Sequence, residues 1–385
     1  MVHIVGWGHT QFGKLAEMGL EDLIVAAGGE ALEHARVAPG EVDGIWLGHF
    51  NGGMVGDGFA SSLALGIDDA LRFTPATRVE NACASGAAAI FAARDAIDSG
   101  RARIALVIGA EKMTHLPTAE VAKGLGHASY QAEEAGLSFP QVFAGFARAY
   151  YDKWGDQTGT LARIASKNHA NAMNNPLAQL HKPLPVAFCE EVSERNPMVA
   201  DPLKVTDCSL VSDGAAALVL VADDLAAAMP QAVHLRASAQ VNDFLPMSRR
   251  DLTAFEGPKR AMAQALASAG MTLDDLDVAE VHDCFTIAEL MIYEAMGLTA
   301  PGQGMRALDE GLVMPGGKLP VNMSGGLKAK GHPVGATGVS MHVLIARQVS
   351  GTADAMQVPG AATGLVFNMG GSGVASYASV LEAVR

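Results

Sequence analysis

Residues 81–91 read NACASGAAAIF, and this stretch joins an extended segment to a helix. Residues 76–80 (ATRVE) are typical of a strand, and the small residues after Ser85 predict a helix that packs closely on its neighbours. Cys83 would then lie at a helix start, where free backbone N–H groups and the helix dipole favour a thiolate and lower the thiol pKa. A buried, unreactive cysteine is the commoner alternative, and this stretch alone does not decide between the two.

The composition indicates a compact α/β protein. The chain has 385 residues, of which 49% are hydrophobic, 18% are charged and 43 are glycine, so it can form two domains with large cores. A formal net charge of −14 argues against nucleic acid as a partner. The four cysteines have no regular spacing, which predicts neither a disulfide framework nor a metal site and fits a reducing compartment.

The N-terminus gives no sign of export. Residues 1–7 (MVHIVGW) read as a first strand rather than a signal peptide. No apolar run approaches the roughly 18 residues that a membrane span needs. We therefore expect a cytoplasmic protein with no membrane partner.

A unit of helix, acidic turn and strand occurs twice in the chain. Residues 31–47 and residues 265–281 share this layout at a constant offset, so that Asp43 corresponds to Asp277. A second strand–helix–strand set also has a counterpart: 77–81, 83–97 and 104–109 match 320–323, 334–349 and 364–369. This duplication predicts two similar halves related by a pseudo-twofold axis, with helices covering mixed sheets.

The region between the halves, roughly residues 112–196, is richer in His, Tyr, Asn and Pro. Within it, basic residues gather around a lone Asp156: Lys153, Arg163, Lys167 and Lys182. Each of them alone is most simply part of a solvated helix face. As a group they could neutralise a phosphorylated ligand.

Two further motifs each contain a histidine. Residues 281–285 (VHDCF) follow an apolar strand, which would deliver His282 and Cys284 to the carboxyl edge of the sheet, where ligands bind. Residues 325–338 (GGLKAKGHPVGATG) surround His332 with glycines and a proline just before a helix. The glycine spacing does not match that of phosphate-binding loops. The pattern favours a histidine held rigidly within reach of a reacting group.

In this order and spacing, the motifs resemble the thiolase superfamily over essentially the whole chain. The HDCF block at 282–285 resembles the sterol-carrier-protein type of thiolase, and so do residues 167–176 and residues 212–217. The resemblance implies the α/β thiolase fold, with two βαβαβαββ halves in α-β-α-β-α layers, an inserted loop domain and no lipid-carrier domain. We place the N-terminal half at 1–111 plus 197–228, the loop domain at 112–196 and the C-terminal half at 229–385.

The resemblance also implies a CoA-dependent acyltransferase that condenses acyl-CoA with acetyl-CoA, or cleaves a 3-oxoacyl-CoA by thiolysis. Cys83 would hold the acyl group, with His332 as its base. Ordinary thiolases carry an acid/base cysteine near the C-terminus; this chain reads NMGG there, and Cys284 would replace that thiol. His282 and His332 would serve the enolate oxygen, and the backbone N–H groups of Cys83 and Gly370 would hold the acyl oxygen.

The expected ligands are CoA and acyl-CoA, with no tightly bound cofactor and no metal. We place the CoA phosphates near Arg163, Lys167, His169 and Lys182. The loops at 50–59 and 129–146 would set the acyl-chain specificity. The family implies a homodimer or homotetramer.

Three alternatives stay open at this point. A ketosynthase-like enzyme would use Cys83, His282 and His332 and leave Cys284 idle. An acetyltransferase would act on a phenolic or ketone acceptor. A non-catalytic subunit would pair with a small zinc-ribbon/OB-fold protein. Three other residues are interpreted as structural: His49, Cys189 and Cys208.

Overall fold

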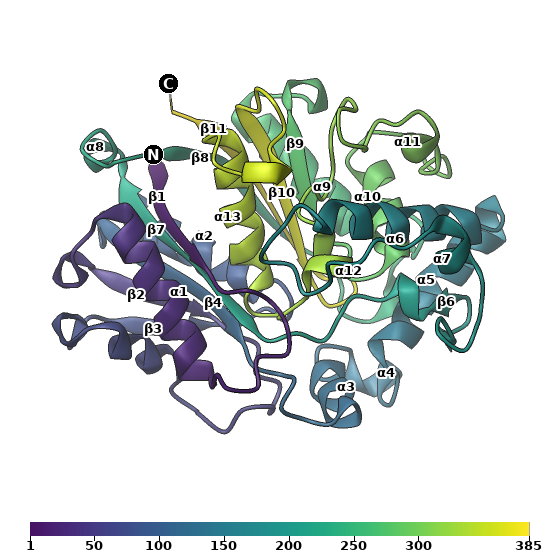
Figure 1. Ribbon diagram of the computed structural model, residues 1–385, viewed down its shortest axis with the longest axis horizontal. Helices are drawn as coiled ribbons and strands as arrows, with labels where there is room; N and C mark the ends of the chain where they lie inside the picture. The colour runs from purple at the N-terminus through teal and green to yellow at the C-terminus, as the bar shows by residue number, and fades with distance from the viewer. Residues whose placement is uncertain (385) are drawn as a thin grey trace.

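One sheet of nine strands runs through the molecule and organises the fold (Figure 1). The computed structural model describes residues 1–384. In spatial order the strands are β3 (Ala76–Val79), β2 (Gly44–Gly48), β4 (Ile104–Glu111), β7 (Gly214–Ala222), β1 (Val2–His9), β8 (Val233–Asn242), β11 (Ala375–Ala383), β10 (Thr363–Gly370) and β9 (Val278–Val281). Beyond β9, an isolated parallel bridge joins Ala279 to Val321.

The predicted repeat is present in the sheet. In the first half β2 pairs in parallel with β4, and in the second half β9 pairs in parallel with β10. Asp43 Oδ2 accepts two backbone N–H groups at the start of β4, at 2.7 and 2.9 Å. Asp277 Oδ2 accepts two at the start of β10, at 2.8 and 2.9 Å. The two aspartates therefore perform the same local task in both halves.

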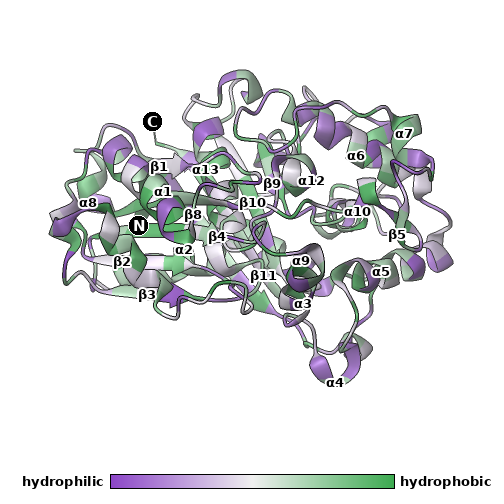
Figure 2. Ribbon diagram, turned by 60° about the horizontal axis from the view of Figure 1, so that its bottom comes forward, coloured by the Kyte–Doolittle hydropathy of each residue, from purple (hydrophilic) through white to green (hydrophobic). Residues whose placement is uncertain are grey.

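The helices form the outer and central layers of the fold. On the outside, α1 (Leu20–Ala35) packs on β1 and β7, and α9 (Glu256–Ala269) packs on β8 and β11. Between the two half-sheets, α2 (Ser85–Asp98) packs on β2 and β4, α13 (Thr337–Val349) packs on β10 and β7, and the two helices contact each other. The half-sheets join where β1 pairs with β8. These contacts give the predicted α-β-α-β-α layers. Figure 2 shows hydrophobic residues along the strands, which lie between the layers of helices.

Residues 112–196 add helices beside the C-terminal half. They are α3 (Thr118–Gly126), α4 (Gln131–Glu134), α5 (Phe139–Trp154), α6 (Thr158–Ala172) and α7 (Val186–Glu190), followed by the strand pair β5 (Met198–Ala200) and β6 (Leu203–Lys204). The remaining helices are α8 (Asp223–Ala226), α10 (Thr286–Ala295), α11 (Arg306–Asp309) and α12 (Gly326–Lys330). Because α6 packs on α10 and α12, the inserted helices contact the region that carries the HDCF motif. The domain boundaries themselves stay a prediction.

Several expected element ends were wrong by a few residues. The helix expected from Cys83 begins at Ser85, and the helix expected from Val334 begins at Thr337. The strand expected at 320–323 is reduced to the bridge at Val321. Among residues 1–384, no helix has the length and apolar character needed to cross a membrane.

Candidate active site

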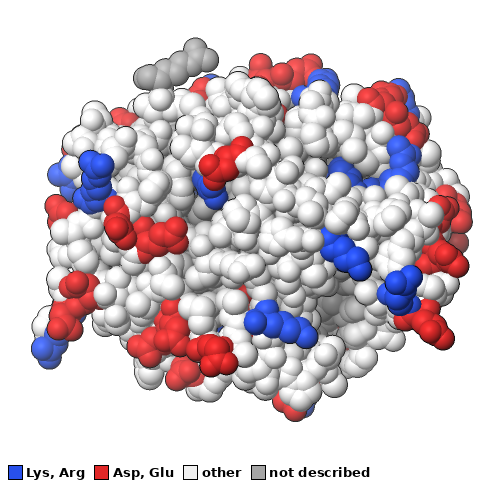
Figure 3. Space-filling model, viewed as in Figure 1, with Lys and Arg blue, Asp and Glu red and all other residues white. Residues whose placement is uncertain are grey.

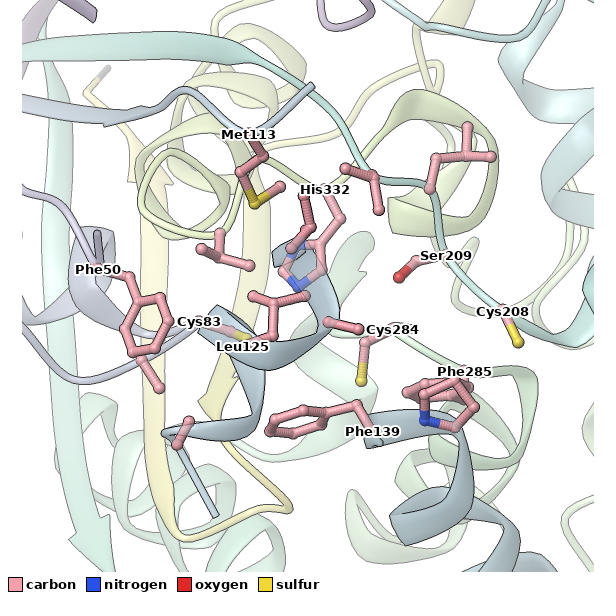
Figure 4. A pocket seen from close by; sticks show the side chains of 18 of the residues that line it. Phe50, Cys83, Met113, Leu125, Phe139, Cys208, Ser209, Cys284, Phe285 and His332 are labelled. Atoms are coloured by element: carbon pink, nitrogen blue, oxygen red, sulfur yellow. The ribbon is translucent and has the colours of Figure 1, made fainter. Parts of the chain in front are cut away.

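The two central helices, α2 and α13, contact each other near their N-termini, where glycines allow their backbones to approach closely. A Cβ atom at Gly86 would lie 2.8 Å from the carbonyl oxygen of Gly335, and one at Gly338 would lie 2.3 Å from the backbone of α2. No side chain fits at either position without displacing backbone. Cys83 lies just before α2 and His332 just before α13, so this contact brings both to one cavity (Figure 4).

Three of the predicted catalytic side chains meet at this point. The Cys83 sulfur and one ring nitrogen each of His282 and His332 lie within 4.8 Å of one another. The two imidazole rings meet edge to face, with centroids 5.1 Å apart and planes at 84°. His282 comes from the loop after β9, so the cluster combines residues from both halves of the chain.

The hydrogen bonds of His332 assign its ring nitrogens. Thr337 Oγ1 donates its proton to the Pro333 carbonyl oxygen at 3.0 Å and therefore accepts from His332 Nδ1–H at 2.7 Å. Nε2 then keeps its lone pair. Burial, with the nearby Lys330 ammonium, lowers the pKa of His332 to about 3, so the ring is neutral at pH 7. A neutral imidazole with a free Nε2 suits a base that takes a proton from Cys83.

The opposite tautomer is imposed on His282. Asn368 Nδ2 donates to the Cys83 carbonyl oxygen at 3.2 Å, which fixes the orientation of the amide. The same Nδ2 lies 2.9 Å from His282 Nδ1, which must therefore accept. Nε2 carries the proton, is buried and has no hydrogen-bond partner among the described residues. Burial keeps the pKa of His282 well below its usual range. A neutral, buried N–H without a partner suits an oxyanion donor.

A tight turn positions Cys83 itself. Ala82 has φ +50, a left-handed conformation that is uncommon outside glycine. Ser85 Oγ stabilises this turn by donating to the Ala82 carbonyl oxygen at 2.6 Å and accepting the Asn81 N–H at 2.9 Å. The expected lowering of the Cys83 pKa was wrong. Burial raises the pKa of this thiol to about 12, and the hydrogen bond from the Gly371 backbone opposes the shift only in part.

The glycine pair at the end of β10 approaches the cysteine turn closely. A Cβ atom at Gly370 would lie 2.3 Å from the Asn81 carbonyl oxygen, so only glycine fits there. The next residue, Gly371, has φ +60, lines the cavity and donates its N–H to the Cys83 sulfur. Sequence reasoning missed Gly371, because two adjacent glycines do not show which N–H faces the thiol. The role given to Gly370 stays a prediction.

The second thiol lies in the same cavity. Cys284 is 5% exposed and lines the cavity together with Cys83, as Figure 4 shows. Burial raises the pKa of Cys284 well above its usual range, and the neighbouring Cys83 and Asp283 add to the shift. The cysteine is therefore a thiol in the resting site and has a proton to deliver.

The cavity around both thiols has a volume of about 180 Å³ and walls that are mainly apolar. Its walls come from α3, from the start of α5, from the loop at 208–211 and from the loop after β2: among the residues are Phe50, Val121, Leu125, Phe139, Leu210 and Val211. The loops at 50–59 and 129–146, expected to set specificity, each contribute residues to it. Cys208 also lines the cavity, although it was interpreted as structural; its sulfur donates to the Lys204 carbonyl oxygen at 3.4 Å.

The residues expected near the CoA phosphates are not equivalent. Lys182 is exposed, and its carbonyl oxygen accepts from His169 Nδ1 at 2.9 Å. His169 is 2% exposed, and burial lowers its pKa to about 4, so it offers no positive charge. Arg163 forms an ion pair with Asp309. Figure 3 shows basic side chains around a hollow in the lower right of this face.

The expectation that Lys167 lies near the CoA phosphates was wrong. This residue is 3% exposed, and its ammonium lies 2.6 Å from a Glu289 carboxylate oxygen and 2.9 Å from the Val321 carbonyl oxygen. A buried lysine paired in this way cannot reach a phosphate in solvent. The charge pattern of the sequence could not reveal the burial, because Glu289 is more than a hundred residues away.

Two residues that sequence reasoning missed fix the tautomers of the site. Thr337 lies inside the glycine-rich motif and Asn368 inside the C-terminal NMGG segment. Their types offered a signal, since a buried hydroxyl or amide near a histidine usually hydrogen-bonds it. Only the structure shows which nitrogen each one contacts.

Comparison with known families decides the identity of this fold. A family described as "Thiolase, N-terminal domain" matches residues 2–224, and one described as "Thiolase C-terminal domain-like" matches residues 239–383. The chain belongs to the thiolase family. The similarity to the sterol-carrier-protein type is confirmed by sterol carrier protein 2 of Bos taurus, which is 34% identical over 387 residues, 96% of this chain and 70% of that protein.

Other relatives agree with an acyltransferase. An acetyl-CoA acetyltransferase of Methanothermobacter thermautotrophicus is 38% identical over 378 residues, which cover 97% of both chains. Among solved structures, the Ltp2-ChsH2(DUF35) aldolase has a TM-score of 0.83 at 22% identity, covering 100% of this chain and 98% of that one. Human mitochondrial 3-ketoacyl-CoA thiolase in complex with CoA has a TM-score of 0.76 at 18% identity, with the same coverage. The two structures show the thiolase fold, and the protein is a thiolase-type acyltransferase.

Proposed function

We propose that this thiolase interconverts a 3-oxoacyl-CoA plus CoA with an acyl-CoA plus acetyl-CoA, through an acyl group carried on Cys83. The observation that carries the proposal is the cluster of the Cys83 sulfur with ring nitrogens of His282 and His332 within 4.8 Å. The acetyl-CoA acetyltransferase relative supports the same substrate class.

In the thiolysis direction, His332 Nε2 takes the Cys83 proton as the sulfur attacks the 3-oxo carbon. The bond between C2 and C3 of the substrate then breaks, which leaves the acyl group on Cys83 and an acetyl-CoA enolate. His282 Nε2–H donates to the enolate oxygen, and the Cys284 thiol delivers a proton to its carbon. Free CoA finally displaces the acyl group from Cys83: the Cys83 sulfur takes back the proton held by His332, and the proton of the CoA thiol returns to Cys284. The condensation runs the same steps in reverse.

The thiol pKa values agree with this order of events. Because the Cys83 pKa is raised to about 12, its proton must leave as the new bond forms, and the adjacent neutral His332 can accept it. The Cys284 pKa is also raised, so a proton is available when the enolate appears. Each thiol thus begins thiolysis in the protonation state that its role requires.

The test is intact-mass analysis after mixing the enzyme with acetyl-CoA. We expect an adduct of one acetyl group on Cys83, released when free CoA is added, and no adduct in Cys83→Ala. Folded wild-type protein that forms no adduct would contradict the proposal.

Cys284→Ala separates thiolase from ketosynthase-like chemistry within the same experiment. The variant should still form the acetyl adduct but should lose exchange of the acetyl-CoA methyl protons with deuterated water by about 100-fold, a typical contribution of general acid–base catalysis. Cys189→Ala, which removes a buried thiol outside the cavity, should leave both reactions unchanged. Unchanged exchange and turnover in Cys284→Ala would favour the ketosynthase-like alternative.

For the ligands and partners we keep a narrower proposal. Lys182, exposed beside the inserted helices, is the candidate for a CoA phosphate contact, and loss of its charge should weaken CoA binding. The name of one structural neighbour, Ltp2-ChsH2(DUF35) aldolase, joins two components, which supports a search for a small partner subunit. The homo-oligomeric state and the cytoplasmic location remain predictions.

A further inference from the structure

Buried carboxylates hold the loop that carries His332 on both sides of the histidine. Before it, the Asp283 carboxylate accepts the N–H groups of residues 327–328, at 2.6 and 3.2 Å. After it, Glu111 Oε2 accepts the Gly335 N–H at 3.0 Å. Asp283 is 1% exposed and Glu111 is fully buried. These bonds therefore fix the backbone on either side of the base.

The sequence leaves room for both carboxylates. A Cβ atom at Gly326, where φ is +58, would lie 2.2 Å from Asp283 Oδ2. A Cβ atom at Gly335 would lie 2.8 Å from Glu111 Oε2. These two glycines thus stand where a carboxylate approaches the backbone, so glycine is required for the contact, and at Gly326 for the positive φ as well.

Each carboxylate also connects the His332 loop to a second part of the site. Asp283 is the residue between His282 and Cys284 in the chain, so its bonds tie the HDCF segment to the loop. Glu111, at the end of β4, also accepts the N–H of Phe50 at 3.0 Å, and Phe50 lines the cavity. One carboxylate comes from each half of the fold.

We propose that Asp283 and Glu111 are positioning residues that hold His332 against Cys83 and set the separation of the catalytic groups. The inference rests on the proposed function in one respect: the groups positioned are those assigned to acyl transfer. A misplacement of about 1 Å can slow an enzyme by roughly 100-fold, so fixing this backbone matters for the rate.

The amide analogues cannot make the same set of bonds. Asp283 also accepts Asn168 Nδ2 at 2.8 Å, so two oxygens serve three donors. Glu111 also accepts the Asn51 N–H at 3.0 Å and lies 3.1 Å from His49 Nδ1. Asn or Gln keeps the shape but offers one accepting oxygen and turns an NH₂ group toward a donor. In Asp283→Asn one of the two N–H groups of 327–328 would lose its partner, because they bond different oxygens. In Glu111→Gln either Gly335 or Asn51 would lose its partner, depending on how the amide is turned.

Hydrogen–deuterium exchange tests the clamp without any substrate. In Glu111→Ala, which removes both oxygens, the Gly335 amide should exchange about tenfold faster, and in Asp283→Asn at least one amide of 327–328 should do so, each without a change at the other end of the loop. The matched control is Asp277→Asn, which also removes a carboxylate that accepts two adjacent backbone N–H groups, at the opposite end of the parallel strands. It should leave peptide 325–338 unchanged.

Kinetics then test whether the clamp positions the catalytic groups. Acetylation of Cys83 from acetyl-CoA should slow by about tenfold or more in both clamp variants, with KM for CoA within about twofold of wild type. A purely structural role would lower the melting temperature and leave the acetylation rate of the folded fraction intact.

The outcomes separate the two hypotheses. Faster exchange in the loop with an unchanged acetylation rate, or no change in exchange, would overturn the positioning role. If wild-type protein shows no acetylation at all, the proposed function fails, while the exchange measurement still decides whether the carboxylates hold the loop.

Discussion

At the level of single residues, the site holds neutral groups in defined proton states. His332 presents a lone pair and His282 presents an N–H, although both rings are buried and uncharged at pH 7. Thr337 and Asn368 impose this difference through one hydrogen bond each. Two chemically identical side chains thereby suit the two different roles that we propose for them, a base and an oxyanion donor.

The protonation state of Cys83 leads to a direct prediction. Because burial raises its pKa to about 12, the thiolate fraction of the free enzyme should grow about tenfold per pH unit between pH 7 and pH 10. The rate of alkylation by iodoacetamide, followed by the mass of the Cys83 peptide, should rise over this range without a plateau. A plateau near pH 8 would contradict the prediction, because it would show that the Cys83 pKa is lowered, as expected for a thiol beside a helix N-terminus without burial.

At the level of elements, the sequence could predict what depends on local pattern. The repeat around Asp43 and Asp277 predicted that the chain contains two similar half-sheets. The glycines near His332 predicted a tight loop before a helix. What depends on contacts between distant elements could not be predicted. Lys167 looked like a surface cation because its partner, Glu289, lies on another helix. The raised pKa of Cys83 likewise comes from burial that a helix start does not reveal.

The elements that enclose the cavity predict its preference for acyl chains. Leu125 on α3 lines the cavity, and Leu125→Trp should fill space that a longer acyl chain would occupy. We expect kcat/KM for 3-oxooctanoyl-CoA to fall about tenfold more than that for acetoacetyl-CoA, since an apolar pocket discriminates by the size of the chain. Ala119→Trp, on the same helix but outside the cavity, is the control. Equal losses on both substrates would contradict this use of the cavity.

At the scale of the whole molecule, the buried histidines make the fold sensitive to acid. Burial lowers the pKa of His9 and His332 to about 3 and that of His169 and His342 to about 4. Between these values and pH 6.5, the unfolded chain holds a proton at each site that the folded chain lacks. Stability therefore rises with pH in this range and is lost as the pH falls.

Asp283 has the opposite effect on the pH dependence of stability. Burial raises its pKa to about 7, so below pH 7 the folded chain keeps a proton that the unfolded chain has lost, and this group favours folding in acid. Burial shifts the pKa of Glu280 the same way. Histidines with a lowered pKa, which also include His34, His234 and His282, outnumber the histidines and carboxyl groups with a raised pKa, which are Asp283, Glu280 and His49, so stability is lost on balance in acid.

We accordingly predict that the urea midpoint of unfolding falls as the pH is lowered from 7 to 4.5. Well below pH 6.5, each buried histidine contributes about 1.4 kcal/mol per pH unit. His342→Gln removes one of these groups on α13, away from the catalytic cluster; His342 is bonded to the Gly338 carbonyl oxygen and to Ser379. The variant should be less stable at pH 7, yet its midpoint should depend less steeply on pH than that of wild type. A midpoint that stays constant or rises toward pH 4.5 would show that the buried imidazoles do not control the acid stability of the fold.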